Sequence, residues 1–277
     1  MRNRAYEQPR GAAWMYLLIL LTFPIFFATN DLFRNHRELL AWLPEWRPTY
    51  FLAIVLPFGT ILPALALGWL IRSHDGDRRR FGATLTPRDL SLGLLGLALG
   101  GMMLYFQAWR PLPPEARSLG VLIHDFTWLV FPSIAEALVF IGVVFHVTEI
   151  GVRRWWHGRA GRVAGAIAAI VISALAFGLF HFSYPAPWNT WDLVRTMFFV
   201  WLGVAAFYSL TRSMPATLML HTTLAMTGFL RNQLELPGSD MLGLALDAVA
   251  ILTVLVIVAN ASAAPRALPG HQPTGLR

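Results

Sequence analysis

The chain contains no cysteine and no lysine, and charged residues of either sign are scarce. Without cysteine it can form no disulfide framework, no thiolate zinc site and no cysteine nucleophile. Charged residues make up 13% of its 277 residues, against about 25% in an ordinary soluble domain. Because lysine is absent, arginine alone supplies the positive charge behind the net charge of +7. These shortages disfavour both a soluble enzyme and a disulfide scaffold.

Long apolar runs take up most of the sequence, and hydrophobic residues reach 56% of the total. A helix needs about 20 apolar residues to cross a bilayer. We therefore expect an all-α polytopic transmembrane bundle of about eight spans, a single domain over residues 1–262, and a disordered tail over residues 263–277. The expected spans are Ala13–Thr29, Tyr50–Ile71, Leu90–Trp109, Phe126–Val147, Val163–Phe182, Leu193–Leu210, the short Pro215–Leu230, and Leu242–Ala261.

The arginines predict the topology of these spans. Fifteen of the 22 lie on one set of connecting segments and seven on the opposite set. Arginine-rich segments face the cytoplasm, so we expect both termini to be cytoplasmic, as an even number of spans requires. The arginines are spread over short segments between apolar runs, which is not how a groove for nucleic acid is built. Tryptophans such as Trp42, Trp46 and Trp109 cluster near the expected outer edge, as an interfacial belt does.

Glu136 is the most informative residue, because it lies in the otherwise uncharged run FPSIAEALVFIGVVF. An ionised carboxylate at the centre of a span costs about 2.5–3.5 kcal/mol on insertion scales, so such a residue is a functional candidate. His181 and His221, in later apolar runs, are its natural partners. A glutamate can take a proton from water, and histidines can hold that water, bind a metal or stabilise an oxyanion. The three side chains therefore form a candidate hydrolytic set.

Each of these residues also has a structural interpretation. A single histidine near a helix end, such as His181, is usually interfacial and bonded to a carbonyl or water, and we expect His146 to be interfacial as well. Glu136 could instead pair with an arginine that reaches inward, either Arg195 or Arg231. The glycines of LGLLGLALGG indicate close helix packing rather than a nucleotide-binding loop, because their surroundings are apolar and no strand precedes them.

Three short patterns follow one another along the chain. Glu136 begins the segment EALVFIG, Phe177 precedes His181 by four residues, and the run YSLTRSMP, which begins at Tyr208, leads to His221. In order and spacing they resemble the motifs of the CPBP family, the CAAX-protease and bacteriocin-processing intramembrane proteases. The resemblance implies an intramembrane protease whose family-like core covers about residues 126–230.

The sequence departs from this family pattern at three positions. Ala137 stands where the family has a second glutamate, Ile141 where it has an arginine, and Ala225 where it has an asparagine. The loss of the arginine removes the obvious counter-charge for Glu136 and predicts an unpaired carboxylate. These departures leave room for a chain that has kept the fold and lost the activity.

The resemblance also implies roles for individual residues. Glu136 would be the general base, and His181 and His221 would complete the water and oxyanion site. A divalent metal such as zinc, if one binds, would be held by the two histidines. The hydroxyl of Thr222 or Thr223 would replace the missing asparagine, since a hydroxyl can donate a hydrogen bond. Phe177 belongs to the second motif and supports the site.

The leading hypothesis is a divergent intramembrane endopeptidase in a bacterial inner membrane. Its substrate would be a membrane-anchored protein or peptide, and its surroundings the lipid bilayer, with no nucleic acid partner. The alternative is a catalytically inactive relative that binds hydrophobic tails or partner membrane proteins. A transporter with Glu136 as a proton relay is a third hypothesis, disfavoured because the sequence shows no inverted repeat or broken helix of the expected kind.

Overall fold

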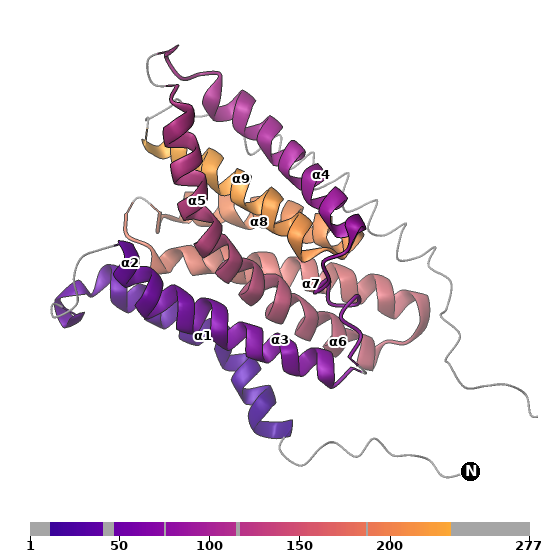
Figure 1. The fold of residues 1–277 in the computed structure, drawn as a ribbon. Coiled ribbons are helices and arrows are strands. Elements are labelled where there is room, and N and C mark those ends of the chain that lie inside the picture. Colours follow the sequence, from indigo (N-terminus) through magenta and orange to yellow (C-terminus); the bar gives the residue numbers. More distant parts are fainter. Residues whose placement is uncertain (1–11, 41–46, 75, 115–116, 187, 234–277) are drawn as a thin grey trace, which may run out of the picture.

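The computed structural model describes residues 12–40, 47–74, 76–114, 117–186 and 188–233, and every regular element within these ranges is a helix (Figure 1). This confirms the predicted all-α class. The α-helices are α1 (Ala12–Asn35), α2 (Arg47–Tyr50), α3 (Leu62–Arg72), α4 (Pro87–Leu104), α5 (Leu119–Glu136), α6 (His146–Trp155), α7 (Gly158–Phe180), α8 (Trp191–Thr211) and α9 (Met214–Gln233). Between them lie the π-helices η2 (Phe51–Ile61), η3 (Tyr105–Trp109) and η5 (Ala137–Phe145), and the 3-10 helices η1 (Arg37–Leu40) and η6 (His181–Ser183).

Five helical stretches of the described chain are long and apolar enough to cross a membrane. They match the second to sixth expected spans and are Phe51–Arg72, Pro87–Trp109, Leu119–Trp155, Gly158–Ser183 and Trp191–Thr211. The first expected span falls on α1, and the seventh, expected to be short, falls on the 20-residue helix α9. The eighth span, the tail and two of the belt tryptophans lie outside the described residues, so the count of eight and the placement of the termini stay predictions.

The longest stretch, Leu119–Trp155, places Glu136 in the middle of the bundle. Glu136 is the last residue of α5, and the chain continues without a break as the π-helix η5 and then α6. π-helical segments inside α-helices are rare overall, and those that occur often lie at functional sites. Most residues that follow Glu136 in η5 are apolar and buried, Phe140 and Ile141 completely so. The carboxylate therefore has no polar neighbour within this π-helix.

Small residues let the neighbouring helices approach closely. Gly96 and Gly100 of α4 face α9, and a Cβ atom added to Gly96 would collide with the carbonyl oxygen of Ala216. One added to Gly100 would collide with the side chain of Thr223. Figure 1 shows α4 lying beside α9. The expectation that this glycine-rich stretch serves close helix packing is confirmed, since small residues at an interface bring helix backbones together.

A buried ion pair joins α6 to the turn between α8 and α9. Both carboxylate oxygens of Glu149 accept from the Arg212 guanidinium, at 2.8 and 2.7 Å. Burial lowers the pKa of Arg212, but the Glu149 carboxylate outweighs this and holds that pKa above its usual value, so the cation persists. Arg212 has a left-handed φ of 51°, and the segment before α4 docks against it through Gly82, whose carbonyl accepts from the Met214 amide at 3.1 Å.

His146 belongs to this buried cluster, and its expected place at the membrane interface stays a prediction. Its side chain is 1% exposed, and its Nε2 atom lies 2.7 Å from the Tyr208 hydroxyl. The ring of Phe81 packs against it, with ring centroids 4.6 Å apart. Leu119–Trp155 continues about two turns beyond the expected end of the span, so His146 stays among the packed helices.

Cysteine labelling tests the topology, because the wild-type chain contains no cysteine. Asp77 lies in the arginine-rich segment between α3 and α4, and Ala186 lies between η6 and α8; both are exposed. From the arginine distribution we expect a membrane-impermeant maleimide to label Ala186→Cys in intact cells, and Asp77→Cys only after permeabilisation. The reverse labelling pattern would show that the orientation in the membrane is opposite to the one predicted.

The Glu149–Arg212 pair predicts a large loss of stability when one partner is removed. Arg212→Met leaves a buried carboxylate short of two hydrogen bonds, and breaking a buried pair in this way costs about 3–5 kcal/mol. Arg153→Met is the matched control, because Arg153 is 27% exposed and lies 3.5 Å from the same carboxylate. We expect the thermal unfolding midpoint in detergent to fall much further for Arg212→Met. Equal falls in the midpoint would show that the two short Arg212–Glu149 hydrogen bonds stabilise the protein no more than the Arg153 contact does.

Candidate active site

The structure brings Glu136 and His221 into direct contact. Glu136 ends α5, and His221 lies on α9, 85 residues later in the chain. The Nε2 atom of His221 lies 2.7 Å from the Oε2 atom of Glu136, and the two side chains are 4% and 9% exposed. A short bond between a carboxylate and an imidazole can hold and transfer a proton. The Nδ1 atom of His221 is buried and has no hydrogen-bond partner among the described residues.

Tyr184 holds the other oxygen of the Glu136 carboxylate. Its hydroxyl donates to Oε1 at 3.1 Å. Burial, and then the nearby Glu136 carboxylate, raise the pKa of the Tyr184 phenol well above its usual value. The phenol therefore keeps its proton at neutral pH and acts as the donor. Both carboxylate oxygens of Glu136 are bonded, so the expectation of an unpaired carboxylate was wrong.

His181 lies beside the same carboxylate and interacts with it electrostatically. Its Nδ1 atom lies 3.0 Å from the backbone carbonyl of Phe177. A carbonyl can only accept, so Nδ1 carries the proton and the Nε2 atom of the neutral ring has a free lone pair. The ring stacks on Tyr184, with centroids 5.3 Å apart and planes 19° apart. The predicted bond to a carbonyl is present, but the side chain is buried rather than interfacial.

A layer of aromatic rings supports both histidines. Phe177 meets His181 and His221 edge-on, with centroid distances of 4.8 and 5.6 Å. It stacks on Trp201 of α8, with centroids 3.9 Å apart and planes 17° apart. The indole N–H of Trp201 donates to the Ser173 hydroxyl at 2.8 Å, and that hydroxyl donates to the Phe140 carbonyl at 3.0 Å. The rings are thus fixed from three helical segments, which limits the motion of the imidazoles.

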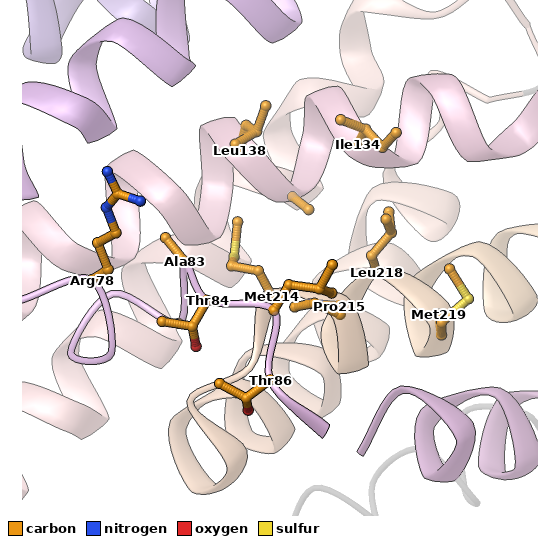
Figure 2. A pocket seen from close by; sticks show the side chains of 13 residues that line it. Arg78, Ala83, Thr84, Thr86, Ile134, Leu138, Met214, Pro215, Leu218 and Met219 are labelled. Atoms are coloured by element: carbon orange, nitrogen blue, oxygen red, sulfur yellow. The ribbon is translucent and has the colours of Figure 1, made fainter. Parts of the chain in front are cut away.

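An apolar cavity of about 820 Å³ lies between the α5–η5 helix, α9 and the segment before α4 (Figure 2). Ile134, Ala137 and Leu138 line it from α5 and η5, and residues of α9 such as Leu218 line it from another side. Polar groups are confined to the segment before α4, where Arg78, Thr84 and Thr86 contribute to the lining. The lining includes Ala137, the residue after Glu136, but not Glu136, His181 or His221.

Comparison with known proteins identifies the part of the chain that contains this site. Residues 119–227 match the family model described as Type II CAAX prenyl endopeptidase Rce1-like. The chain carries an Rce1-like domain. A search of curated proteins found no match, and a search of solved structures found none either. The domain begins at α5 and includes Glu136, His181 and His221.

Thr222 and Thr223, expected to replace the missing asparagine of the Rce1-like domain, are placed differently from each other. The Thr223 hydroxyl donates to carbonyls of its own helix, those of Met219 and Leu220, and its side chain packs against Gly100 of α4. The Thr222 hydroxyl is buried and has no hydrogen-bond partner within the described part of the chain. Of the two, Thr222 is the one with a hydroxyl still available for an incoming group.

Sequence reasoning missed Tyr184, Trp201 and Arg34 as parts of the site. Tyr184 lies only three residues after His181, so its nearness along the chain was the signal that could have found it. Trp201 and Arg34 lie on other helices, and nothing in the sequence links them to the motifs of the Rce1-like domain. Arg34 of α1 interacts electrostatically with Glu136, and its guanidinium lies over the Tyr184 ring, 4.4 Å from the centroid.

The two arginines that sequence reasoning proposed as partners for Glu136 bond elsewhere. Arg195 pairs with Asp192 at 3.2 Å, and Arg231 donates to the Gln107 carbonyl at 2.8 Å. A divalent metal held by the two histidines stays a prediction from the sequence. No three His, Asp or Glu side chains of the described residues converge closely enough to hold an ion. The Nε2 atom of His221 is already used by Glu136, so the chemistry below is derived without a metal.

The Trp201–Ser173 hydrogen bond predicts that removing the Ser173 hydroxyl destabilises the protein. Ser173→Ala would leave the buried indole N–H without its acceptor, which costs about 1–3 kcal/mol. Ser91→Ala is the matched control, since Ser91 is exposed on α4, and surface changes usually stay within about 0.5 kcal/mol. We expect Ser173→Ala alone to lower the thermal unfolding midpoint in detergent. Unchanged midpoints in both variants would show that this bond does not stabilise the aromatic layer.

Proposed function

We propose that this protein is an intramembrane endopeptidase that hydrolyses a peptide bond in a membrane-associated protein or peptide. One observation carries the proposal: the buried Glu136–His221 contact of 2.7 Å within an Rce1-like domain. A carboxylate in the interior of an apolar bundle is unfavourable unless its environment compensates for the lost water. A pair that can accept and release a proton is suited to activating water for hydrolysis.

In the proposed mechanism Glu136 acts as the general base. A water molecule beside the carboxylate gives one proton to a Glu136 oxygen while its own oxygen attacks the peptide carbonyl carbon. His221 and Tyr184 hold the two carboxylate oxygens, so the base has a defined orientation before the reaction begins. When the tetrahedral intermediate collapses, the carbon–nitrogen bond breaks and Glu136 returns the proton to the leaving amine.

The histidines handle the water and the developing negative charge. In its neutral ring, the Nε2 atom of His181 is an acceptor that can orient the water, because its Nδ1 atom is bonded to the Phe177 carbonyl. A His181 ring that is protonated before the reaction would instead donate from Nε2 and stabilise the oxyanion of the intermediate. The Thr222 hydroxyl is a further candidate donor.

The apolar cavity supports an apolar substrate. Its lining near Ala137 consists of aliphatic and methionine side chains, while its polar groups belong to the segment before α4. Apolar residues of a membrane-anchored chain would bind to this lining. The family description names prenylated CAAX proteins, and this apolar lining accommodates apolar peptide residues as readily as a prenyl group. A bacterial inner membrane and a zinc ion bound at the histidines stay predictions from the sequence.

Replacing Glu136 tests the proposal directly. Cells with the wild-type chain are compared with cells carrying Glu136→Gln, and new protein termini are quantified by terminal-peptide mass spectrometry. Removal of a general base lowers the rate by about 100-fold or more, so uncut membrane-anchored proteins should accumulate in the variant. Glu38→Gln is the control, because it makes the same change at a glutamate that is 69% exposed.

Two outcomes separate the leading hypothesis from its alternative. Accumulation of uncut proteins in Glu136→Gln, but not in Glu38→Gln, supports a protease and identifies its substrates. Identical termini in all three strains, with the physiological effect of the chain preserved, would reject proteolysis. That result would favour an inactive Rce1-like protein that binds hydrophobic tails, which the substitutions Ala137, Ile141 and Ala225 also motivate.

A further inference from the structure

We propose that Arg34 of α1 is a positioning residue for Glu136. Its guanidinium holds the Tyr184 phenol against one carboxylate oxygen and supplies the positive charge that the first motif lacks at Ile141. This inference rests on the proposed function, because a general base must be ionised to accept a proton. Arg34 lies outside residues 119–227, so the match to the Rce1-like family does not assign it a role.

The guanidinium of Arg34 packs against two aromatic rings. The carbon atom of its guanidinium lies 4.3 Å from the centroid of the Tyr50 ring and 4.4 Å from that of the Tyr184 ring. A cation over a ring face within about 6 Å is attracted by the ring quadrupole, and a planar guanidinium can stack on both sides. The Nε atom donates to the Asn30 side-chain oxygen at 3.3 Å. The cation therefore has a defined place rather than a mobile one.

Asn30 connects Arg34 and Tyr50 to Ser183, two residues after the histidine of the second motif. Its side chain is fully buried, and its oxygen also accepts from the Tyr50 hydroxyl at 2.6 Å. Its amide nitrogen donates to the backbone carbonyl and to the hydroxyl of Ser183, at 3.1 and 2.6 Å. Ser183 directly precedes Tyr184, so the position of α1 fixes the backbone from which the phenol extends.

The Tyr184 phenol links Arg34 to the Glu136 carboxylate. Tyr184 stacks on His181, lies against Arg34 and donates to Glu136. Arg34 also interacts electrostatically with both Glu136 and His181. A positive charge nearby favours the ionised form of a carboxyl group, and so does a hydrogen bond donated to it. Arg34 supplies the first influence directly and the second through Tyr184.

The other groups around the carboxylate do not provide a permanent charge. The titratable and charged groups facing Glu136 are His221 of α9, His181 of η6, Tyr184, Tyr50 of α2 and Arg34 of α1. Imidazoles and phenols both have an uncharged form, and the tyrosines donate as neutral phenols. Arginine stays charged throughout. Within this set, Arg34 is the group whose charge does not depend on pH.

The test uses the full chain in lipid vesicles and does not depend on finding a substrate. Infrared spectra recorded over a pH series follow the carbonyl band of the protonated Glu136 side chain, which is assigned by its absence in Glu136→Gln. In Arg34→Gln we expect this band to persist to a pH about one unit higher than in the wild type. Arg195→Gln is the control, because Arg195 is 60% exposed and pairs with Asp192.

A cleavage assay then asks whether the same charge matters for turnover. Membranes from cells lacking the chain are incubated with the purified variants, and the Glu136-dependent termini are quantified over the pH series. Arg34→Gln should move the acidic limb of the pH–rate profile upward by about one unit, with the rate recovering at higher pH. Arg34→Lys should stay closer to wild type because it keeps the charge. Tyr184→Phe combined with Arg34→Gln should cost less than the sum of the single changes if Arg34 acts through Tyr184.

The outcomes distinguish this inference from the proposed function. Infrared bands that titrate alike in Arg34→Gln and Arg195→Gln would overturn it. So would a loss of cleavage that is equal at every pH, is not rescued by Arg34→Lys and follows a lower unfolding midpoint, since that pattern marks a structural residue. If Glu136→Gln still cleaves while the infrared shift is present, the proposed function fails and the coupling of Arg34 to Glu136 stands.

Discussion

A carboxylate enclosed by apolar helices must have both of its oxygens bonded, and this requirement organises the site. The residues that follow Glu136 in η5 are apolar and offer its carboxylate no hydrogen bond. Its partners therefore come from other segments: His221 from α9 and Tyr184 from the turn after η6. Those partners require α5, α7 and α9 to pack closely, which small residues at the helix interfaces allow. The site and the packing of the bundle thus depend on one another.

The two buried glutamates of Leu119–Trp155 show how surroundings separate structure from chemistry. Glu149 is held by two short bonds from Arg212 and by a longer contact with Arg153, so its charge is fully compensated by groups that do not titrate near neutral pH. Glu136 is bonded instead by an imidazole and a phenol. These partners can share or exchange a proton, whereas arginine cannot. The Glu149 carboxylate is suited to joining helices, and the Glu136 carboxylate to proton transfer.

The Rce1-like domain does not form the surroundings of Glu136 alone. Asn30, Arg34 and Tyr50 precede the matched region, yet they hold the backbone and ring of Tyr184. An arginine carried by a separate helix can place its charge near the base without belonging to the first motif. The buried isoleucine at position 141 is compatible with such an arrangement, because the positive charge approaches the carboxylate from α1 instead.

Local sequence was sufficient to predict the helical class, five spans and the three central polar residues, because each leaves a mark within one segment. A span is a continuous apolar run, and a charge within it stands out against that background. It was not sufficient for Tyr184, Trp201 and Arg34, or for the buried position of His146. Tyrosine and tryptophan are ordinary at membrane edges, and an arginine near a helix end is ordinary as a topology signal. Their roles depend on which helices pack together and at which register, and only the tertiary structure decides that, since close packing joins residues more than a hundred positions apart.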